Sequence, residues 1–222
     1  MHTTLSVQPA SAALTGVLLA GGESRRLGRD KTALRLFGAD GPSLLLRNAG
    51  LLAELAAQVL ISCRPGTERH TDAYSVVHDE FPDSGPAGGI HAALKRCNGP
   101  VLALSCDLPF MNRETLEHLV AWREQRPEGT LMSTFIRTEN GNIEPLVAVY
   151  ELPALPGFEQ ALALGERALH RIIAPGFRHC LPYGPNEERA FFNINTPTEL
   201  ETARALINVR AAQEPHDAPA AR

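Results

Sequence analysis

The segment 19–31, LAGGESRRLGRDK, brings two adjacent glycines together with basic side chains. Gly21 and Gly22 have no side chains, so the backbone N–H groups around them can close on the oxygens of a phosphate. Basic side chains follow the glycines, among them Arg25, Arg26 and Lys31. Their positive charge would neutralise a triphosphate and the charge that develops when it is cleaved. The segment therefore predicts a nucleoside triphosphate site, with Arg26 and Lys31 as candidate catalytic groups.

This segment fits neither of the two commonest glycine-rich nucleotide motifs. It lacks the GxxxxGK[ST] pattern of the Walker A loop and the GxGxxG pattern of dinucleotide sites. Two adjacent glycines alone would indicate an ordinary turn bearing solvated arginines. The run of glycines, arginines and lysine directly after an apolar stretch favours phosphate binding instead.

Two aspartates follow other apolar segments in the same way. Asp79 comes just before a second glycine-rich stretch, FPDSGPAGGI at 81–90, which opens a predicted helix and allows close approach of backbone to a ligand. Asp107 follows the apolar run VLALSC at 101–106. One carboxylate combined with phosphate oxygens suits Mg²⁺, so Asp107 is the candidate metal ligand. The alternative interpretation is an aspartate that starts a turn shortly before a proline.

A pair of amides, Asn193 and Asn195, precedes a strong helix start near the end of the chain. Thr196 can cap that helix, Pro197 suits its first position and Glu199 completes a capping box. The two amides could contact a ligand, or they could satisfy the backbone of the loop.

These residues must be positioned by alternating strands and helices. Short apolar runs predict strands at 15–20, 59–63, 75–78 and 101–106, and apolar periodicity and capping residues, with Asn112 as one cap, predict helices at 43–58, 89–96 and 114–126. Such alternation is typical of a parallel, doubly wound sheet, in which ligands bind at the carboxyl ends of the strands. The glycine-rich loop, Asp79 and Asp107 all follow strands, which is where a ligand would lie.

The pattern changes in the second half of the chain. The segments 130–136 and 143–150 flank a Glu-Asn-Gly-Asn turn, which predicts an antiparallel pair, and helical stretches follow at 158–164 and 167–173. We expect an α/β fold of three layers, with a mostly parallel central sheet and helices on both faces. Residues 15–212 would form a single domain, preceded by a flexible extension at 1–14 and followed by a flexible tail at 213–222.

Composition excludes several other classes of protein. The net charge of −4 gives no reason to expect a nucleic acid partner, and no apolar run approaches the roughly 20 residues that cross a bilayer. The N-terminus lacks the basic region of a signal peptide. The chain has four cysteines, at Cys63, Cys97, Cys106 and Cys180. Their wide spacing argues against a zinc site or a disulfide framework. We therefore expect a cytoplasmic enzyme in a reducing compartment.

Several segments together resemble one family of enzymes. LLAGGESRRLGRDKTAL, VVHDEFPDSGPAGGI, LALSCDLPF, IEPLVAVY and FFNINTPTEL occur in the order seen in the molybdenum cofactor guanylyltransferases, over roughly residues 15–205. The first of them is shared with the wider nucleotidyltransferase superfamily, whereas its combination with NINTPTEL is far more specific. The resemblance implies transfer of GMP from GTP to molybdenum-molybdopterin, with Mg²⁺ required and pyrophosphate released.

The resemblance also implies roles for individual residues. The nucleotide would contact a set that comprises Leu19, Ala20, Gly21, Gly22, Lys31, Ser62, Asp79 and Asp107. Within this set Lys31 would bind phosphates, Asp79 would line the guanine pocket and Asp107 would hold magnesium. Asn193 and Asn195 would lie on the molybdopterin side. Candidate partners are molybdenum-insertion proteins and molybdoenzyme chaperones.

The chain departs from the family's pattern at a few positions. Cys63 stands where the family usually has an amide that helps to bind nucleotide, Gly-Pro-Ala-Gly-Gly replaces the usual Gly-Pro-Leu-Ala-Gly at 85–89, and Leu27 replaces a common methionine. The resemblance assigns no role to Glu144.

Three rival functions stay open. A cytidylyltransferase of the same cofactor typically has Leu-Ala-Ala-Gly in the first motif, so Gly21 favours guanine. A sugar-1-phosphate nucleotidyltransferase shares the first motif but not the Asn-Ile-Asn-Thr-Pro segment. A nucleotide-binding chaperone without turnover would have no need of a metal carboxylate at Asp107.

Overall fold

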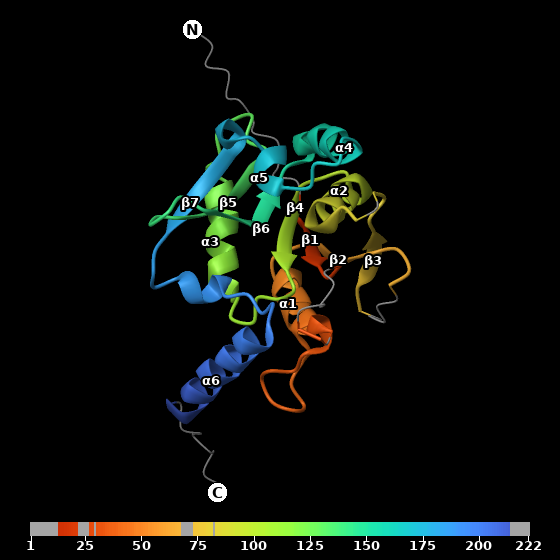
Figure 1. Ribbon diagram of the computed structural model, residues 1–222. Coiled ribbons are helices and arrows are strands. Elements are labelled where there is room, and N and C mark those ends of the chain that lie inside the picture. Colours follow the sequence, from red (N-terminus) through yellow and green to blue (C-terminus); the bar gives the residue numbers. More distant parts are fainter. Residues whose placement is uncertain (1–12, 22–26, 29, 68–72, 82, 214–222) are drawn as a thin grey trace, which may run out of the picture.

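The computed structural model of the protein describes residues 13–21, 27, 28, 30–67, 73–81 and 83–213, and within them a seven-stranded sheet forms the centre of the molecule (Figure 1). The order of its strands is β3-β2-β1-β4-β6-β5-β7. Their bounds are Thr15–Leu19 (β1), Gln58–Cys63 (β2), Ser75–His78 (β3), Val101–Ser105 (β4), Met132–Arg137 (β5), Ile143–Tyr150 (β6) and Arg178–Tyr183 (β7).

Strand β6 alone among these strands runs against its neighbours. β1 pairs in parallel with β2 and β4, β2 with β3, and β5 with β7, whereas β6 is antiparallel to both β4 and β5. The carboxyl ends of β1 to β4 therefore lie at one edge of the sheet, together with the carboxyl ends of β5 and β7. The predicted fold class and the predicted antiparallel pair are both confirmed.

Helices cover both faces of the sheet. Their bounds are Leu44–Ala53 (α1), Gly85–Cys97 (α2), Arg113–Arg123 (α3), Leu155–Ala163 (α4), Leu169–Ile172 (α5) and Pro197–Gln213 (α6), and short 3₁₀ turns lie at Lys31–Ala33 (η1), Leu152–Ala154 (η2), Pro175–Phe177 (η3) and Glu188–Phe191 (η4). One apolar cluster joins the sheet to α1, α3 and η4, and a second joins it to α2, α4 and α5. Helix α6 extends from this body at the lower left (Figure 1). No helix in the described ranges is long and apolar enough to cross a membrane.

Local capping chemistry fixes where several helices begin. The side chain of Asn112 accepts a hydrogen bond from the backbone N–H of Thr115 at 2.9 Å, as the sequence predicted. The predicted capping box before α6 is also present. The N–H of Glu199 donates to the Thr196 hydroxyl at 3.2 Å, and the Glu199 carboxylate accepts from the N–H of Thr196 at 2.8 Å. The Asn193–Asn195 segment is thereby tied to a rigid helix start.

Element boundaries were predicted less well than element types. The predicted first helix at 43–58 was too long, because Ser43 is its N-cap and β2 already begins at Gln58. Helix α2 begins four residues before its predicted start at 89, with Pro86 in its first turn. Strand β7 was missed, since its sequence RHCLPY does not alternate between polar and apolar residues, contains a proline and is only half-buried.

The edges of the predicted domain also need adjustment. Leu14 was assigned to the flexible extension, but it is buried and its carbonyl accepts a hydrogen bond from the N–H of Ala57. Helix α6 reaches Gln213, one residue into the predicted tail. The rest of the predicted flexible segments, 1–12 and 214–222, lies outside the described residues.

Candidate active site

Backbone hydrogen bonds continue past the ends of β1, β2 and β4 and hold the candidate residues together. The N–H of Ala20 donates to the carbonyl of Ser62 at 3.0 Å, and the N–H of Cys106 donates to the carbonyl of Leu19 at 3.3 Å. The N–H of Asp79 reaches the carbonyl of Cys63 at 3.3 Å. These bonds place the start of the glycine-rich loop, Asp79 and Asp107 at the same edge of the sheet, where a ligand of a doubly wound fold binds.

Lys31 lies at the centre of a polar cluster from three distant parts of the chain. Its Nζ donates to Oδ1 of Asn195 at 2.6 Å and lies 3.2 Å from Oδ2 of Asp107. Asp30 caps the 3₁₀ turn that carries Lys31, since its side chain accepts from the N–H of Thr32 at 2.9 Å. The predicted phosphate-binding lysine, the predicted metal ligand and one predicted molybdopterin residue are therefore direct neighbours.

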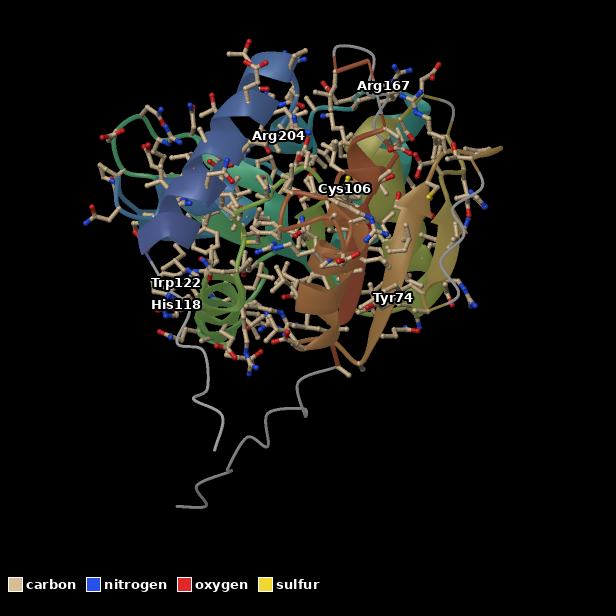
Figure 2. The ribbon with its side chains drawn as sticks, turned by 90° about the horizontal axis from the view of Figure 1, so that it is seen from below. Tyr74, Cys106, His118, Trp122, Arg167 and Arg204 are labelled. Atoms are coloured by element: carbon tan, nitrogen blue, oxygen red, sulfur yellow. The ribbon has the colours of Figure 1, made fainter. Side chains whose placement is uncertain are left out.

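The Asp107 carboxylate is fixed on both of its oxygens. The Ser105 hydroxyl donates to Oδ1 at 2.7 Å, while Lys31 approaches Oδ2. The backbone carbonyl of Asp107 accepts a hydrogen bond from the N–H of Ile194 at 3.0 Å, which ties the Asn193–Asn195 segment to the end of β4. Cys106, the residue before Asp107, is labelled near the centre of the view in Figure 2. The side chain of Asp107 retains 16% exposure, so it can still be reached by a ligand.

The donor set at Asp107 fits a magnesium ion that arrives with a nucleotide. The described residues contain no group of three or more His, Cys, Asp or Glu side chains that could hold a metal ion. A protein cage for a tightly bound ion is thus not formed by them. Mg²⁺ commonly uses one or two carboxylates together with substrate phosphates and water, and a single oriented carboxylate beside a phosphate site meets that requirement.

Asp79 is a buried carboxylate beside α2. Its Oδ1 accepts a hydrogen bond from the Ser62 hydroxyl at 3.3 Å, and the residue is 8% exposed. Burial raises the pKa of Asp79 to about 6, because the charged form loses its hydration; the Ser62 hydrogen bond and the charge of Arg64 partly oppose this. A buried, ionisable carboxylate of this kind suits recognition of N–H groups on a ligand.

Gly88 and Gly89 of α2 allow this close arrangement. A Cβ at Gly89 would lie 2.2 Å from Oγ of Ser62, and a Cβ at Gly88 would lie 3.2 Å from Cγ of Asp79. Gly21 differs from both, because a Cβ there would meet only ordinary contacts, the nearest being the backbone nitrogen of Arg64 at 3.7 Å. The protein itself therefore leaves room for a methyl group at position 21.

The remaining predicted residues fall into three groups. Leu19 and Ala20 are buried at the end of β1, so only their backbone can face a ligand. Asn193 is exposed, whereas Asn195 belongs to the Lys31 cluster. Gly22, Arg25 and Arg26 lie outside the described residues.

Cys63 is fully buried in the core formed with α1 and α3, so its thiol does not take the place of the family's amide.

Three side chains in or near this edge were not assigned roles from sequence. Ser105 orients Asp107, and Asn48 is a buried polar residue on the apolar face of α1. Glu144 accepts a hydrogen bond from the Tyr183 hydroxyl, and burial raises the pKa of Glu144. A polar residue on an otherwise apolar helical face was the available signal for Asn48.

Comparisons with known proteins show the family to which the chain belongs. Residues 16–180 match the model of the MobA-like NTP transferase domain. The chain belongs to this family. A probable molybdenum cofactor guanylyltransferase of Chloroflexus aggregans is 32% identical over 206 residues, which cover 90% of this chain and 97% of that protein. The corresponding protein of Opitutus terrae is 36% identical over 203 residues, 87% of this chain and 96% of its own length.

Solved structures of other proteins share the fold. The molybdopterin-guanine dinucleotide biosynthesis protein A of Archaeoglobus fulgidus superposes with a TM-score of 0.71 at 27% identity, covering 88% of this chain and all of that one. A 2-C-methyl-D-erythritol 4-phosphate cytidylyltransferase of Thermus thermophilus has a TM-score of 0.63 at 16% identity, covering 88% of this chain and 99% of that one. The second likeness concerns the fold alone.

Proposed function

We propose that this protein transfers GMP from GTP to molybdenum-molybdopterin, forming the guanine dinucleotide cofactor and pyrophosphate. The observation that carries the proposal is the convergence of Lys31, Asp107 and Asn195 at one edge of the sheet, in a MobA-like chain. Relatives that bear the name molybdenum cofactor guanylyltransferase support the choice of substrates.

The proposed reaction is an in-line displacement at the α-phosphorus of GTP. An oxygen of the acceptor's terminal phosphate forms the new bond to the α-phosphorus, and the bond from that phosphorus to the α,β-bridging oxygen breaks, so pyrophosphate leaves. A phosphate nucleophile is largely ionised at neutral pH and needs no general base. Catalysis then rests on positioning and on neutralising charge, which Lys31 can supply to the phosphate oxygens. Arg26 would add to this charge.

Mg²⁺ bound by Asp107 would neutralise phosphate charge and polarise the α-phosphorus when the nucleotide is present. The protein's own part is to hold this carboxylate in a fixed orientation through Ser105. Lys31 also faces the carboxylate and can turn from it towards phosphate oxygens.

We propose that Asp79 recognises the guanine base. Its ionised carboxylate can accept hydrogen bonds from the N1–H and the 2-amino group of guanine. Cytosine does not present such a pair of adjacent N–H donors, because its ring nitrogen N3 is an acceptor. Ser62 orients the carboxylate, and Gly88 and Gly89 leave the space beside it. The backbone of Leu19, Ala20, Gly21 and Gly22 would complete the nucleotide site.

The acceptor side would include Asn195 and Asn193, which follow η4 at the same edge of the sheet. Asn195 would sense both substrates, because it contacts Lys31. A cytoplasmic location and transfer of the product to molybdoenzyme chaperones fit this activity and form part of the proposal.

Pyrophosphate release, measured with GTP, CTP and ATP and with and without molybdopterin, tests the proposal. We expect release with GTP only when the acceptor is present. Preference for CTP would favour a cytidylyltransferase of the same cofactor. Release of pyrophosphate when a sugar 1-phosphate is the acceptor would favour a sugar-1-phosphate nucleotidyltransferase. Binding of GTP without release under any of these conditions would favour a chaperone and overturn the proposed function.

A further inference from the structure

Helix α1 carries a fully buried amide, Asn48, on the side that packs against the sheet. It is 0% exposed, and its neighbours on that face are apolar, including Leu45 and Leu52. An amide in such a place is costly unless its hydrogen bonds are satisfied, so its partners indicate why it is tolerated.

The partners of Asn48 are the backbone carbonyls on both sides of Asp107. Its Nδ2 lies 3.3 Å from the carbonyl oxygen of Ser105, 3.4 Å from that of Cys106 and 3.2 Å from that of Leu108. The two N–H bonds of the amide are thus shared among three carbonyls, with Asp107 in the middle of the segment. This geometry fixes the path of the backbone at the very residue whose carboxylate the proposed reaction uses.

Arg47 sets the orientation of this amide. Its Nη1 donates to Oδ1 of Asn48 at 2.9 Å, which leaves Nδ2 facing the carbonyls. Its Nη2 donates to the carbonyl of Met111 at 2.8 Å, so the same side chain holds the far end of the loop that follows β4. Two adjacent residues of α1 therefore hold the segment 105–111 at four carbonyls.

We propose that Asn48 is a positioning residue for catalysis, which holds the Asp107 carboxylate at the distance and angle that phosphoryl transfer requires. This inference rests on the proposed function, because it assigns Asn48 a role through Asp107. The Ser105 hydroxyl orients the carboxylate itself, while Asn48 fixes the backbone from which it extends. A shift of the segment would move the carboxylate relative to Lys31 without removing any group that touches the nucleotide.

The test compares Asn48→Leu with a matched variant of the same helix. Leucine is close to asparagine in size but donates no hydrogen bond. Leu52→Ala removes a buried apolar side chain from the same helix but none of the hydrogen bonds from Asn48 to the segment 105–111, so it controls for loss of stability. Asp107→Asn is measured in parallel to establish whether the carboxylate matters at all.

Two readouts are needed. The first is steady-state kinetics with GTP and molybdopterin, corrected for the folded fraction. For Asn48→Leu we expect kcat to fall by about tenfold or more, with the KM for GTP changed less than about threefold, since small misplacements of catalytic groups act on turnover. The second is hydrogen exchange of the 105–111 peptide in nucleotide-free protein, which we expect to be about tenfold faster in Asn48→Leu while the β1 and β2 peptides stay protected.

The outcomes separate the two hypotheses. If Asp107→Asn abolishes turnover but Asn48→Leu keeps kcat within about twofold, or matches Leu52→Ala, the positioning role is wrong and the proposed function stands. If Asp107→Asn retains full turnover, the role of the carboxylate fails, and the inference fails with it. Unchanged hydrogen exchange at 105–111 in Asn48→Leu would also overturn the inference.

Discussion

The ammonium of Lys31 lies 3.2 Å from Oδ2 of Asp107, although 76 residues separate them in sequence. Both side chains are mostly buried, at 13% and 16% exposure, so the pair is shielded from solvent more than a surface ion pair. Asp107 would hold the metal ion when the nucleotide is bound, and Lys31 would then turn towards phosphate oxygens. The pair thus joins the two proposed sources of positive charge, which are the metal ion at Asp107 and the ammonium of Lys31. Each of the two residues can be tested separately.

Replacing Asp107 with asparagine keeps the size of the side chain and removes its charge. We expect kcat to fall by about 10²- to 10³-fold, because the metal acts mainly on charge that develops in the transition state. The affinity for GTP should change much less. Calorimetric titration of GTP, combined with turnover measurements, checks this division. Equal losses in affinity and turnover would contradict it.

Asn195 holds the Lys31 ammonium at 2.6 Å, so a negative charge at position 195 should trap that cation. We expect Asn195→Asp to raise the KM for GTP by about tenfold or more, because a charge-assisted hydrogen bond is stronger and the new charge repels the triphosphate. Asn195→Ala should have the smaller effect. Thr198→Asp, which adds the same charge at an exposed position of α6, is the control for simple repulsion. A similar KM in both aspartate variants would refute the trap.

The buried carboxyl of Asp79 predicts a pH dependence of GTP binding. Burial raises the pKa of Asp79 to about 6, so below that pH the carboxyl is protonated and can no longer accept two N–H groups. The KM for GTP should therefore rise as the pH falls through about 6. Asp79→Asn provides the control, since any pH dependence that persists in it belongs to GTP or to other groups. An unchanged pH profile in this variant would argue against the assigned role.

The same group makes a prediction about folding. The folded-state pKa lies above the unfolded value of 3.8, so the folded protein binds more protons between these two values and loses stability as the pH rises from about 4 to about 6. Asp79→Asn should remove this loss and unfold at a higher temperature at pH 8. Thermal unfolding of both proteins at pH 8 and near pH 4 measures the difference.

Much of the site could be predicted because a parallel sheet brings strand ends together. Asp79 and Asp107 were assigned from their places after strands, and both lie at the predicted edge of the sheet. The direct contact of Lys31 with Asn195 could not be predicted, since 164 residues separate them and nothing in a local pattern encodes the distance. Asn48 stands out as a polar residue on an apolar helical face, but its role was missed because its partners are backbone carbonyls. The residue types of the segment that carries these carbonyls do not reveal such contacts.

Gly89 shows how packing overrides local propensity. In an ordinary helix, replacing glycine with alanine stabilises by about 1 kcal/mol. In α2 the added Cβ would lie 2.2 Å from Oγ of Ser62 and 3.0 Å from Cδ2 of Leu19, and such overpacking typically costs about 1–3 kcal/mol. We expect Gly89→Ala to lower the free energy of unfolding measured with urea. The added substitution Ser62→Ala should restore part of the loss, and a stabilised Gly89→Ala single variant would contradict the clash.

Gly21 separates the two nucleotide preferences that the sequence left open. A Cβ at this position would lie 3.7 Å from the backbone nitrogen of Arg64, which is an ordinary contact, so Gly21→Ala should fold with unchanged stability. Any effect must then arise from the ligand. We expect the ratio of kcat/KM for GTP over CTP to fall by about tenfold, since one methyl group in a binding pocket is worth roughly 1–3 kcal/mol. Turnover with both nucleotides measures the ratio, and urea unfolding verifies the fold. If stability and the ratio are both unchanged, position 21 does not discriminate between bases, and the preference for guanine would rest on Asp79 alone.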